Sequence, residues 1–232
     1  TLFMDKYSIL KQYYGHSAFR AGQEALIDAI LSGRDALCVM PTGGGKSLCY
    51  QIPALLLPGI TLVVSPLISL MKDQVAALKS AGISAAYINS SLTGEQIRTV
   101  YARTRKGAYK LIYVAPERLE TNSFLSLMQE MDVSFLAVDE AHCISQWGQD
   151  FRPSYLGIVD FINALPRRPI VAAYTATATK QVQSDILRLL QLQSPYRIVT
   201  GFDRPNLYFD VRRPKNKFSA LAALIDERRG RS

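Results

Sequence analysis

One stretch near the N-terminus decides the fold: Ala36-Leu37-Cys38-Val39-Met40-Pro41-Thr42-Gly43-Gly44-Gly45-Lys46-Ser47, followed by the apolar run Leu48–Leu57. Its first five residues are apolar and predict a short buried strand, and its last part has apolar residues at helical spacing. Between them, three glycines let the backbone turn tightly and direct N–H groups inward, at the positive end of the helix. The stretch therefore predicts a strand, a phosphate-binding loop and a helix.

The loop has the side chains that a nucleoside triphosphate needs. Lys46 would neutralise the β and γ phosphates, and the Ser47 hydroxyl would bind Mg²⁺. We expect the phosphates to be bound by Thr42, Gly43, Gly44, Gly45, Lys46 and Ser47. The alternative is a glycine-rich turn that precedes Lys-Ser by chance, and the strand before it and the helix after it disfavour this. The strict motif has glycine where this chain has Met40.

Outward from this stretch, short apolar runs alternate with helical patterns. The expected strands are Ala36–Met40, Thr61–Ser65, Ala85–Ile88, Leu111–Val114, Phe135–Val138, Ile170–Ala173 and Arg197–Val199. Helical spacing occurs in segments such as Gly22–Leu31, Lys46–Leu57, Leu67–Lys79, Gly94–Arg105 and Lys180–Leu190. This alternation predicts an α/β fold with a mostly parallel sheet and helices on both faces. In such sheets, ligands bind at the carboxyl ends of the strands.

A second candidate site follows the expected strand Phe135–Val138, which ends in Asp139-Glu140-Ala141-His142. A carboxylate at this position can bind Mg²⁺ opposite Ser47, and its neighbour can orient the attacking water for phosphoryl transfer. We assign Mg²⁺ to Asp139 and the water to Glu140. The alternative, two acids that cap a helix, is disfavoured because the phosphate loop occurs in the same chain.

Composition sets limits on the partners and the compartment. The 232 residues have a net charge of +8, and residues 204–232 hold an excess of five positive charges. A polyanionic partner is favoured, although such charge runs are often only solvated surface. Cys38, Cys49 and Cys143 lie far apart without a C-x-x-C pair, which predicts a reducing compartment and no zinc site.

No membrane span or secretion signal is expected. Residues 48–71 carry no charge, but Pro53, Pro58, Gly59 and Pro66 interrupt them. Residues 1–20 lack the pattern of a secretion signal. The sequence thus predicts a protein that is not secreted, in the cytoplasm or nucleoid of a bacterium or the nucleus of a eukaryote.

Together, the 42–47 loop and Asp139–His142 resemble the ATPase motifs of superfamily-two helicases, whose loops often replace the glycine at Met40. The following residues, Cys143-Ile144-Ser145-Gln146-Trp147-Gly148-Gln149-Asp150-Phe151-Arg152-Pro153, resemble the aromatic-rich loop of the RecQ family. Five further segments resemble RecQ signatures in the expected order: Tyr14–Gln23, Ser65–Gln74, Tyr113–Leu119, Tyr174–Ala178 and Phe202–Asn206. The resemblance spans residues 14–206.

The resemblance implies a RecA-like P-loop NTPase fold. Residues 1–206 would form the first, ATP-binding lobe, and residues 207–232 would be a linker and the truncated start of a second lobe. The catalytic residues would be Lys46, Asp139, Glu140 and His142. Two positions depart from the family pattern: Gln149 replaces the usual histidine of the loop that, in the family, links DNA contact to ATP hydrolysis, and Ala21 replaces a proline.

The segment Tyr14–Gln23 is similar to an adenine-recognition motif. The resemblance implies that Gln23 recognises the adenine edge, Arg20 supports it, and His16 packs against the base. An amide donates and accepts at once, which matches adenine N6 and N7, whereas guanine presents two acceptors. The alternative for His16 is an ordinary surface histidine.

The DNA-binding candidates follow the expected strands. Trp147 and Phe151 offer aromatic faces to unstacked bases, and Arg152 offers charge to phosphate. The polar residues that could bind the DNA backbone are Ser65, Ser69, Lys72, Ser90, Ser91 and Arg118. Helix-capping serines and a core tryptophan are the alternatives, but the polar neighbours of Trp147 favour a loop.

The sequence therefore predicts an ATP- and Mg²⁺-dependent motor lobe of a 3′-to-5′ DNA helicase, acting on single strands and on single-strand/double-strand junctions in repair or recombination. The rest of a parent chain would supply the second lobe. Alone, the chain should hydrolyse ATP slowly, unwind nothing and bind DNA in a salt-sensitive way. Two rivals remain: a DEAD-type RNA helicase, disfavoured by His142 and the aromatic loop, and a nucleotide-switched module without catalysis.

Overall fold

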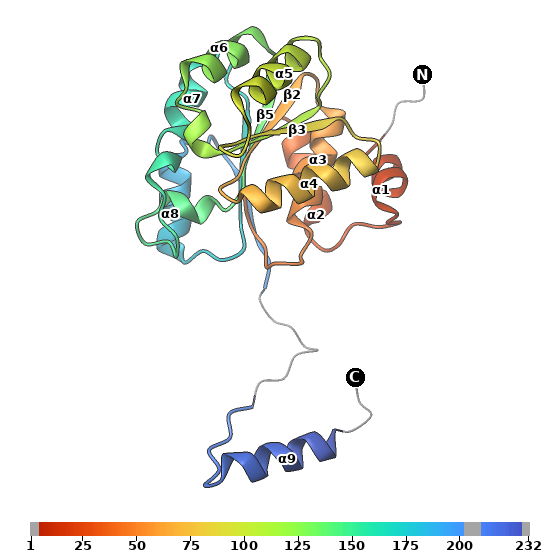
Figure 1. Ribbon diagram of the computed structural model, residues 1–232, viewed down its shortest axis with the longest axis vertical. Helices are drawn as coiled ribbons and strands as arrows, with labels where there is room; N and C mark the ends of the chain where they lie inside the picture. The colour runs from red at the N-terminus through yellow and green to blue at the C-terminus, as the bar shows by residue number, and fades with distance from the viewer. Residues whose placement is uncertain (1–4, 202–209, 229–232) are drawn as a thin grey trace. The chain divides into compact units, whose positions relative to one another are not determined.

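The computed structural model describes residues 5–201 and 210–228 (Figure 1). Its contacts divide the chain into two compact units, Thr1–Gly201 and Phe202–Ser232. The predicted signature Phe202–Asn206 and the expected domain boundary lie outside the described residues. The second unit contains one described helix, α9 (Lys217–Glu227), which begins where the Asn216 side chain accepts a hydrogen bond from Ser219 N.

The first unit is built on a parallel sheet with the strand order β3-β4-β2-β5-β6-β1-β7. Its strands are β1 (Ala36–Val39), β2 (Ile60–Val64), β3 (Ala85–Ile88), β4 (Leu111–Val114), β5 (Val133–Val138), β6 (Ile170–Thr175) and β7 (Tyr196–Val199). Each predicted strand is present, with ends that differ by at most two residues. The predicted fold class, α/β with a parallel sheet, is confirmed.

Helices cover both faces of the sheet (Figure 1). In the first unit they are α1 (Lys6–Tyr14), α2 (Gln23–Leu31), α3 (Lys46–Leu56), α4 (Ile68–Ser80), α5 (Gly94–Arg105), α6 (Asn122–Glu130), α7 (Ile158–Ala164) and α8 (Lys180–Leu189). Within the described residues the longest helix has 13 residues, fewer than the roughly 20 that a bilayer requires, so none of these helices can cross a membrane.

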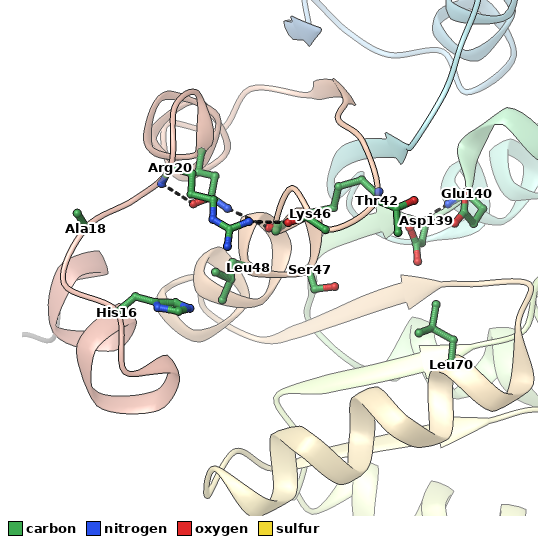
Figure 2. A pocket seen from close by; sticks show the side chains of 13 residues that line it. His16, Ala18, Arg20, Thr42, Lys46, Ser47, Leu48, Leu70, Asp139 and Glu140 are labelled. Atoms are coloured by element: carbon green, nitrogen blue, oxygen red, sulfur yellow. Dashed lines mark hydrogen bonds between the residues drawn. The ribbon is translucent and has the colours of Figure 1, made fainter. Parts of the chain in front are cut away.

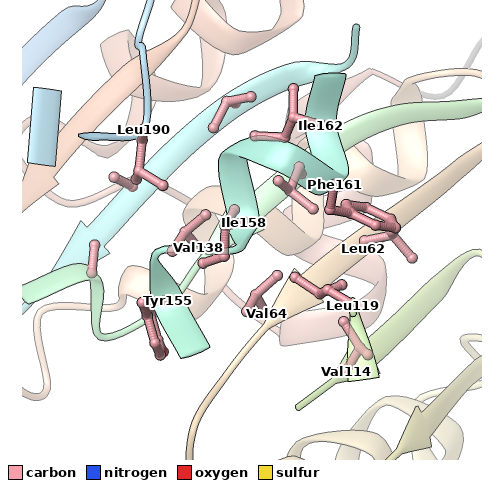
Figure 3. Close-up of a cluster of buried hydrophobic side chains, with 14 of the residues drawn as sticks. Leu62, Val64, Val114, Leu119, Val138, Tyr155, Ile158, Phe161, Ile162 and Leu190 are labelled. Carbon is pink, nitrogen blue, oxygen red and sulfur yellow. The ribbon is translucent and has the colours of Figure 1, made fainter. Parts of the chain in front are cut away.

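Two hydrophobic cores lie on opposite faces of the sheet because successive strand residues point in opposite directions. Leu37 and Val39 of β1 join one core, together with side chains of α5, α6, α7 and α8. Figure 3 shows part of this core, including Leu62 of β2, Val138 of β5 and Ile158 of α7. Ala36 and Cys38 of the same strand join the other core, under α2, α3 and α4. All three cysteines are buried and free. A sheet buried on both faces holds the loops at its carboxyl edge in fixed positions.

Candidate active site

A cavity of about 420 Å³ lies at the carboxyl ends of β1 and β5, which flank β6 in the sheet (Figure 2). It is lined by His16, Ala18, Arg20, Gln23, Thr42, Gly43, Gly45, Lys46, Ser47, Leu48, Leu70, Asp139 and Glu140. The structure thus brings the two acids, the phosphate loop and the predicted base-binding residues to one pocket. Of the predicted nucleotide and catalytic residues, Gly44 and His142 are not in its lining.

The phosphate loop needs its glycines for two different reasons. Gly43 and Gly45 have φ angles of 80° and 83°, a left-handed region that disfavours side chains. Gly44 is required by packing, since an added Cβ would lie 2.6 Å from Met40 Cγ. Lys46 Nζ donates a hydrogen bond of 3.0 Å to the carbonyl of Met40, which places the ammonium group beside the loop.

The segment before α2 is bonded to the phosphate loop. The Gln23 amide nitrogen lies 3.1 Å from the carbonyl oxygen of Gly44 and 3.2 Å from that of Gly45, and its amide oxygen accepts from Arg20 N at 2.8 Å. The Arg20 guanidinium donates to the carbonyl of Gly43 at 2.5 Å. Gln23 is buried, and both ends of its amide are bonded to protein. Sequence reasoning assigned this amide to adenine and missed its bonds to the loop.

Asp139 is a buried acid whose ionised form a nearby cation would stabilise. Its side chain is only 8% exposed, and Oδ1 accepts a hydrogen bond from Glu140 N. Burial and the neighbouring charge of Glu140 raise the pKa of Asp139 to about 6. A divalent cation beside it would favour the ionised form, and the half-buried Ser47 lines the same pocket. The donor set of a carboxylate and a hydroxyl therefore fits Mg²⁺.

Glu140 begins a short polar relay toward β6. Its φ angle of 47° is left-handed, an uncommon conformation for a residue with a side chain. One carboxylate oxygen lies 3.3 Å from His142 Nδ1, and that nitrogen lies 2.9 Å from Thr175 Oγ1. The Cys143 sulfur and the Glu140 carboxylate raise the pKa of His142 to about 10, and the hydrogen bond from His142 lowers the pKa of Glu140.

Sequence reasoning gave Thr175 no role in this site. Its signal was its place in the Tyr174–Ala178 signature, where it is the last residue of β6. The hydroxyl donates onward to the carbonyl of Thr177 at 3.1 Å, so the end of β6 is bonded to the acid pair through His142.

The DNA-binding candidates follow β2, β3, β4 and β5, whose carboxyl ends meet at one edge of the sheet. Ser69, Lys72, Ser90 and Ser91 are exposed. Arg118 is half-buried, with Nη2 at 3.5 Å from the carbonyl of Asn89. Ser65 differs, because it is 1% exposed and its hydroxyl has no partner within the described chain. As placed, this hydroxyl cannot reach a phosphate at the surface.

The aromatic-rich loop extends from the 3-10 turn Ala141–Ile144, which follows the acids. Trp147 is 75% exposed, which confirms the prediction of a loop rather than a core position. Phe151 is half-buried. Arg152 pairs with Asp150 at 2.7 Å and donates to the carbonyl of Pro66 at 3.2 Å, just before α4. The loop is therefore bonded to the region that holds Ser69 and Lys72.

Comparisons with known proteins agree with this arrangement. The DEAD/DEAH box helicase family model matches residues 20–185. The helicase domain of Pyrococcus furiosus Hef superposes with a TM-score of 0.60 at 21% identity, over 78% of this chain and 38% of that one. At this identity the likeness concerns the fold alone.

Curated relatives are closer in sequence. ATP-dependent DNA helicase RecQ of Bacillus subtilis is 51% identical over 90% of this chain, and that of Haemophilus influenzae is 49% identical over 97%. The match covers 36% of either relative, so the chain spans about a third of their length. Since the family model covers more than half of its residues, the chain belongs to the DEAD/DEAH box helicase family, with close sequence similarity to the RecQ helicases.

Proposed function

We propose that this chain is the ATP-binding lobe of an ATP-dependent DNA helicase that unwinds duplex DNA in the 3′-to-5′ direction during repair or recombination. The observation that carries the proposal is the convergence of Lys46, Ser47, Asp139 and Glu140 on one pocket at the carboxyl edge of the sheet. The names of the bacterial relatives, ATP-dependent DNA helicase RecQ, support the choice of substrate.

Each pocket residue has a task in phosphoryl transfer. Lys46 moves from the Met40 carbonyl to the β and γ phosphates, and the loop amides bind phosphate oxygens. Ser47 and Asp139 would hold Mg²⁺, which neutralises phosphate charge when bound. Glu140 orients the attacking water and accepts its proton, while His142 fixes the Glu140 side chain through the 3.3 Å contact.

For the base, we propose that Gln23 recognises the adenine edge, with Arg20 and His16 beside it. All three line the pocket. Because the Gln23 amide is bonded to the loop and to Arg20 N, recognition requires this side chain to exchange those bonds for bonds to adenine. Base recognition would thereby alter the conformation of the phosphate loop.

For DNA, we propose a single-strand track along the carboxyl edge of the sheet. Trp147 and Phe151 would stack on bases, and Lys72, Arg118 and Arg152 would bind phosphates. The exposure of Trp147 and the contact of Arg152 with the start of α4 support this track. Single strands and their junctions with duplex are the expected ligands, and Ser65 would contribute only after a local rearrangement.

The test is ATP turnover by Glu140→Gln. The substitution keeps the shape of the side chain but removes the base, so we expect turnover to fall by about 10²- to 10⁴-fold while ATP still binds. Glu95→Gln, on the exposed first turn of α5, is the matched control. Turnover by Glu140→Gln at the parent rate would exclude catalysis at this acid.

The same assay separates the rivals. Stimulation of the parent chain by single-stranded DNA but not by RNA supports a DNA helicase, and the reverse pattern supports an RNA helicase. Repeated turnover by the parent chain, even slow, that is lost in Glu140→Gln excludes a nucleotide-switched binding module.

A further inference from the structure

A buried acid outside the proposed ATP pocket contacts the base of the aromatic-rich loop. Asp185 of α8 is 7% exposed, and Ser145, at the end of the 3-10 turn, is fully buried. The Ser145 hydroxyl donates to Asp185 Oδ2 at 2.7 Å. A hydrogen bond between a hydroxyl and a carboxylate is stronger than one between neutral groups, and inside a protein its loss leaves a buried charge unsatisfied.

Ser145 in turn organises the loop. Its hydroxyl oxygen accepts from Trp147 N at 3.2 Å, and its carbonyl accepts from Gly148 N at 2.9 Å. On the other side, its backbone nitrogen donates to the carbonyl of His142. Ser145 therefore lies at the junction between the turn that holds His142 and the loop that presents Trp147.

Within the described residues, the other hydrogen-bond partners of Asp185 come from its own helix, and they bond the oxygen that Ser145 does not use. Arg188 pairs with Oδ1 at 3.1 Å, from a side chain that is 69% exposed, and Gln181 approaches the same oxygen at 3.5 Å. Oδ2 is thus the oxygen that faces the loop. The hydrogen bond from Ser145 also lowers the pKa of Asp185, in keeping with an ionised carboxylate.

We infer that Asp185 is a positioning residue that holds the aromatic-rich loop, through Ser145, in the geometry that links DNA binding at Trp147 to the acid pair. The inference rests on the proposed function and deepens it. Asp185 does not line the proposed ATP pocket. Its role is to fix the one segment that carries both a candidate DNA-stacking side chain and, three residues before Ser145, the histidine bonded to Glu140.

The test uses the full 232-residue chain and its one tryptophan, Trp147, as a probe of the loop. The variants are Asp185→Ala, Ser145→Ala and the double variant, with Arg188→Ala as the matched control that removes only the exposed partner. Without ligands, we expect lower fluorescence anisotropy of Trp147 in the first three, because the loop becomes mobile. Stimulation of ATP turnover by oligothymidylate should fall between about 2-fold and 30-fold.

The double variant should be no worse than the more impaired of the two single variants, since both substitutions remove the bond between Ser145 and Asp185. Asp185→Asn, which keeps an acceptor oxygen, should restore part of the stimulation and guards against misfolding of the alanine variant. Parent-like anisotropy or parent-like stimulation in both Asp185→Ala and Ser145→Ala overturns the inference. A parent chain that DNA does not stimulate counts against the proposed function itself.

Discussion

Gln23 shows how one side chain connects the base and phosphate ends of the pocket. The amide nitrogen holds the carbonyls of Gly44 and Gly45, and an added Cβ at Gly45 would lie 2.3 Å from it. Any movement of Gln23 toward a base would therefore break its hydrogen bonds to the phosphate loop. The residue should contribute to specificity and to phosphate binding together.

We expect Gln23→Ala to bring ATP and GTP closer in affinity, because the amide that distinguishes N6 from O6 is gone. The loss of one neutral hydrogen bond should narrow the ATP preference by about 2- to 10-fold. Competitive displacement of a fluorescent nucleotide by ATP, GTP and tripolyphosphate measures the three affinities. Tripolyphosphate separates the two roles, since it has no base. An unchanged ratio of ATP to GTP affinity would remove Gln23 from base recognition.

For single residues, the residue types at the strand ends were predictable from the sequence, but the contacts of their side chains were not. Asp139 stands out because it directly follows an apolar strand, and Lys46 because it ends the glycine-rich loop after another such strand. The burial of Ser65 depends on how α4 packs after β2, and the bond between His142 and Thr175 depends on the neighbouring positions of β5 and β6. Such contacts join residues far apart in the chain, so no local pattern encodes them.

Among the elements, the turn and loop after β5 are held by close backbone packing. An added Cβ at Gly148 would lie 2.3 Å from the carbonyl oxygen of His142 and 3.0 Å from that of Ser145. Both neighbours are backbone atoms, which cannot rotate away as a flexible side chain could. Only glycine permits this path of the loop between Ser145 and Gln149.

Gly148→Ala should therefore displace the aromatic-rich loop without unfolding the sheet. We expect a changed fluorescence spectrum of Trp147 and weaker binding to oligothymidylate. Complete loss of one stacked base, worth about 1–3 kcal/mol, would lower the affinity by about 5- to 150-fold. Gly94→Ala, in α5, is the control because its nearest neighbour is a side-chain atom at 3.7 Å. DNA affinity equal to that of the control would show that the loop geometry is irrelevant to binding.

The strands were predictable because most of them are short apolar runs. Burial on both faces removes the alternation that would have shown which side chain faces which core, so the division into two cores required the structure. The helices α1, α6 and α7 were not among those named from the sequence. They have seven to nine residues, and two turns give a weak apolar period.

For the whole molecule, the pocket is assembled from separate segments of the chain, around residues 16–23, 42–48 and 139–140, together with Leu70. Its described lining contains two cationic side chains, Arg20 and Lys46, and Arg20 is bonded to the Gly43 carbonyl. An arginine that stabilises the transition state would add about 10³–10⁵ in rate. We propose that it comes from a second lobe, consistent with relatives about three times as long.

The 232-residue chain by itself should then hydrolyse ATP slowly and leave duplexes intact, since one lobe has no partner to move against. A strand-displacement assay on a duplex with a 3′ single-stranded tail, with ATP and Mg²⁺, measures this. Full-length RecQ of Bacillus subtilis serves as the positive control. Robust unwinding by the shorter chain would contradict the two-lobe proposal.

The central claim is that the cavity binds ATP with Mg²⁺ through Lys46. The most direct test is titration of a fluorescent ATP analogue into the parent chain, Lys46→Ala and the control Lys79→Ala, with and without Mg²⁺. Because Lys46 lines the pocket and belongs to no hydrophobic core, the variant should keep its fold by circular dichroism. It should bind about 10- to 150-fold more weakly, as for loss of a charged hydrogen bond. Parent-like, Mg²⁺-dependent affinity in Lys46→Ala would contradict the claim.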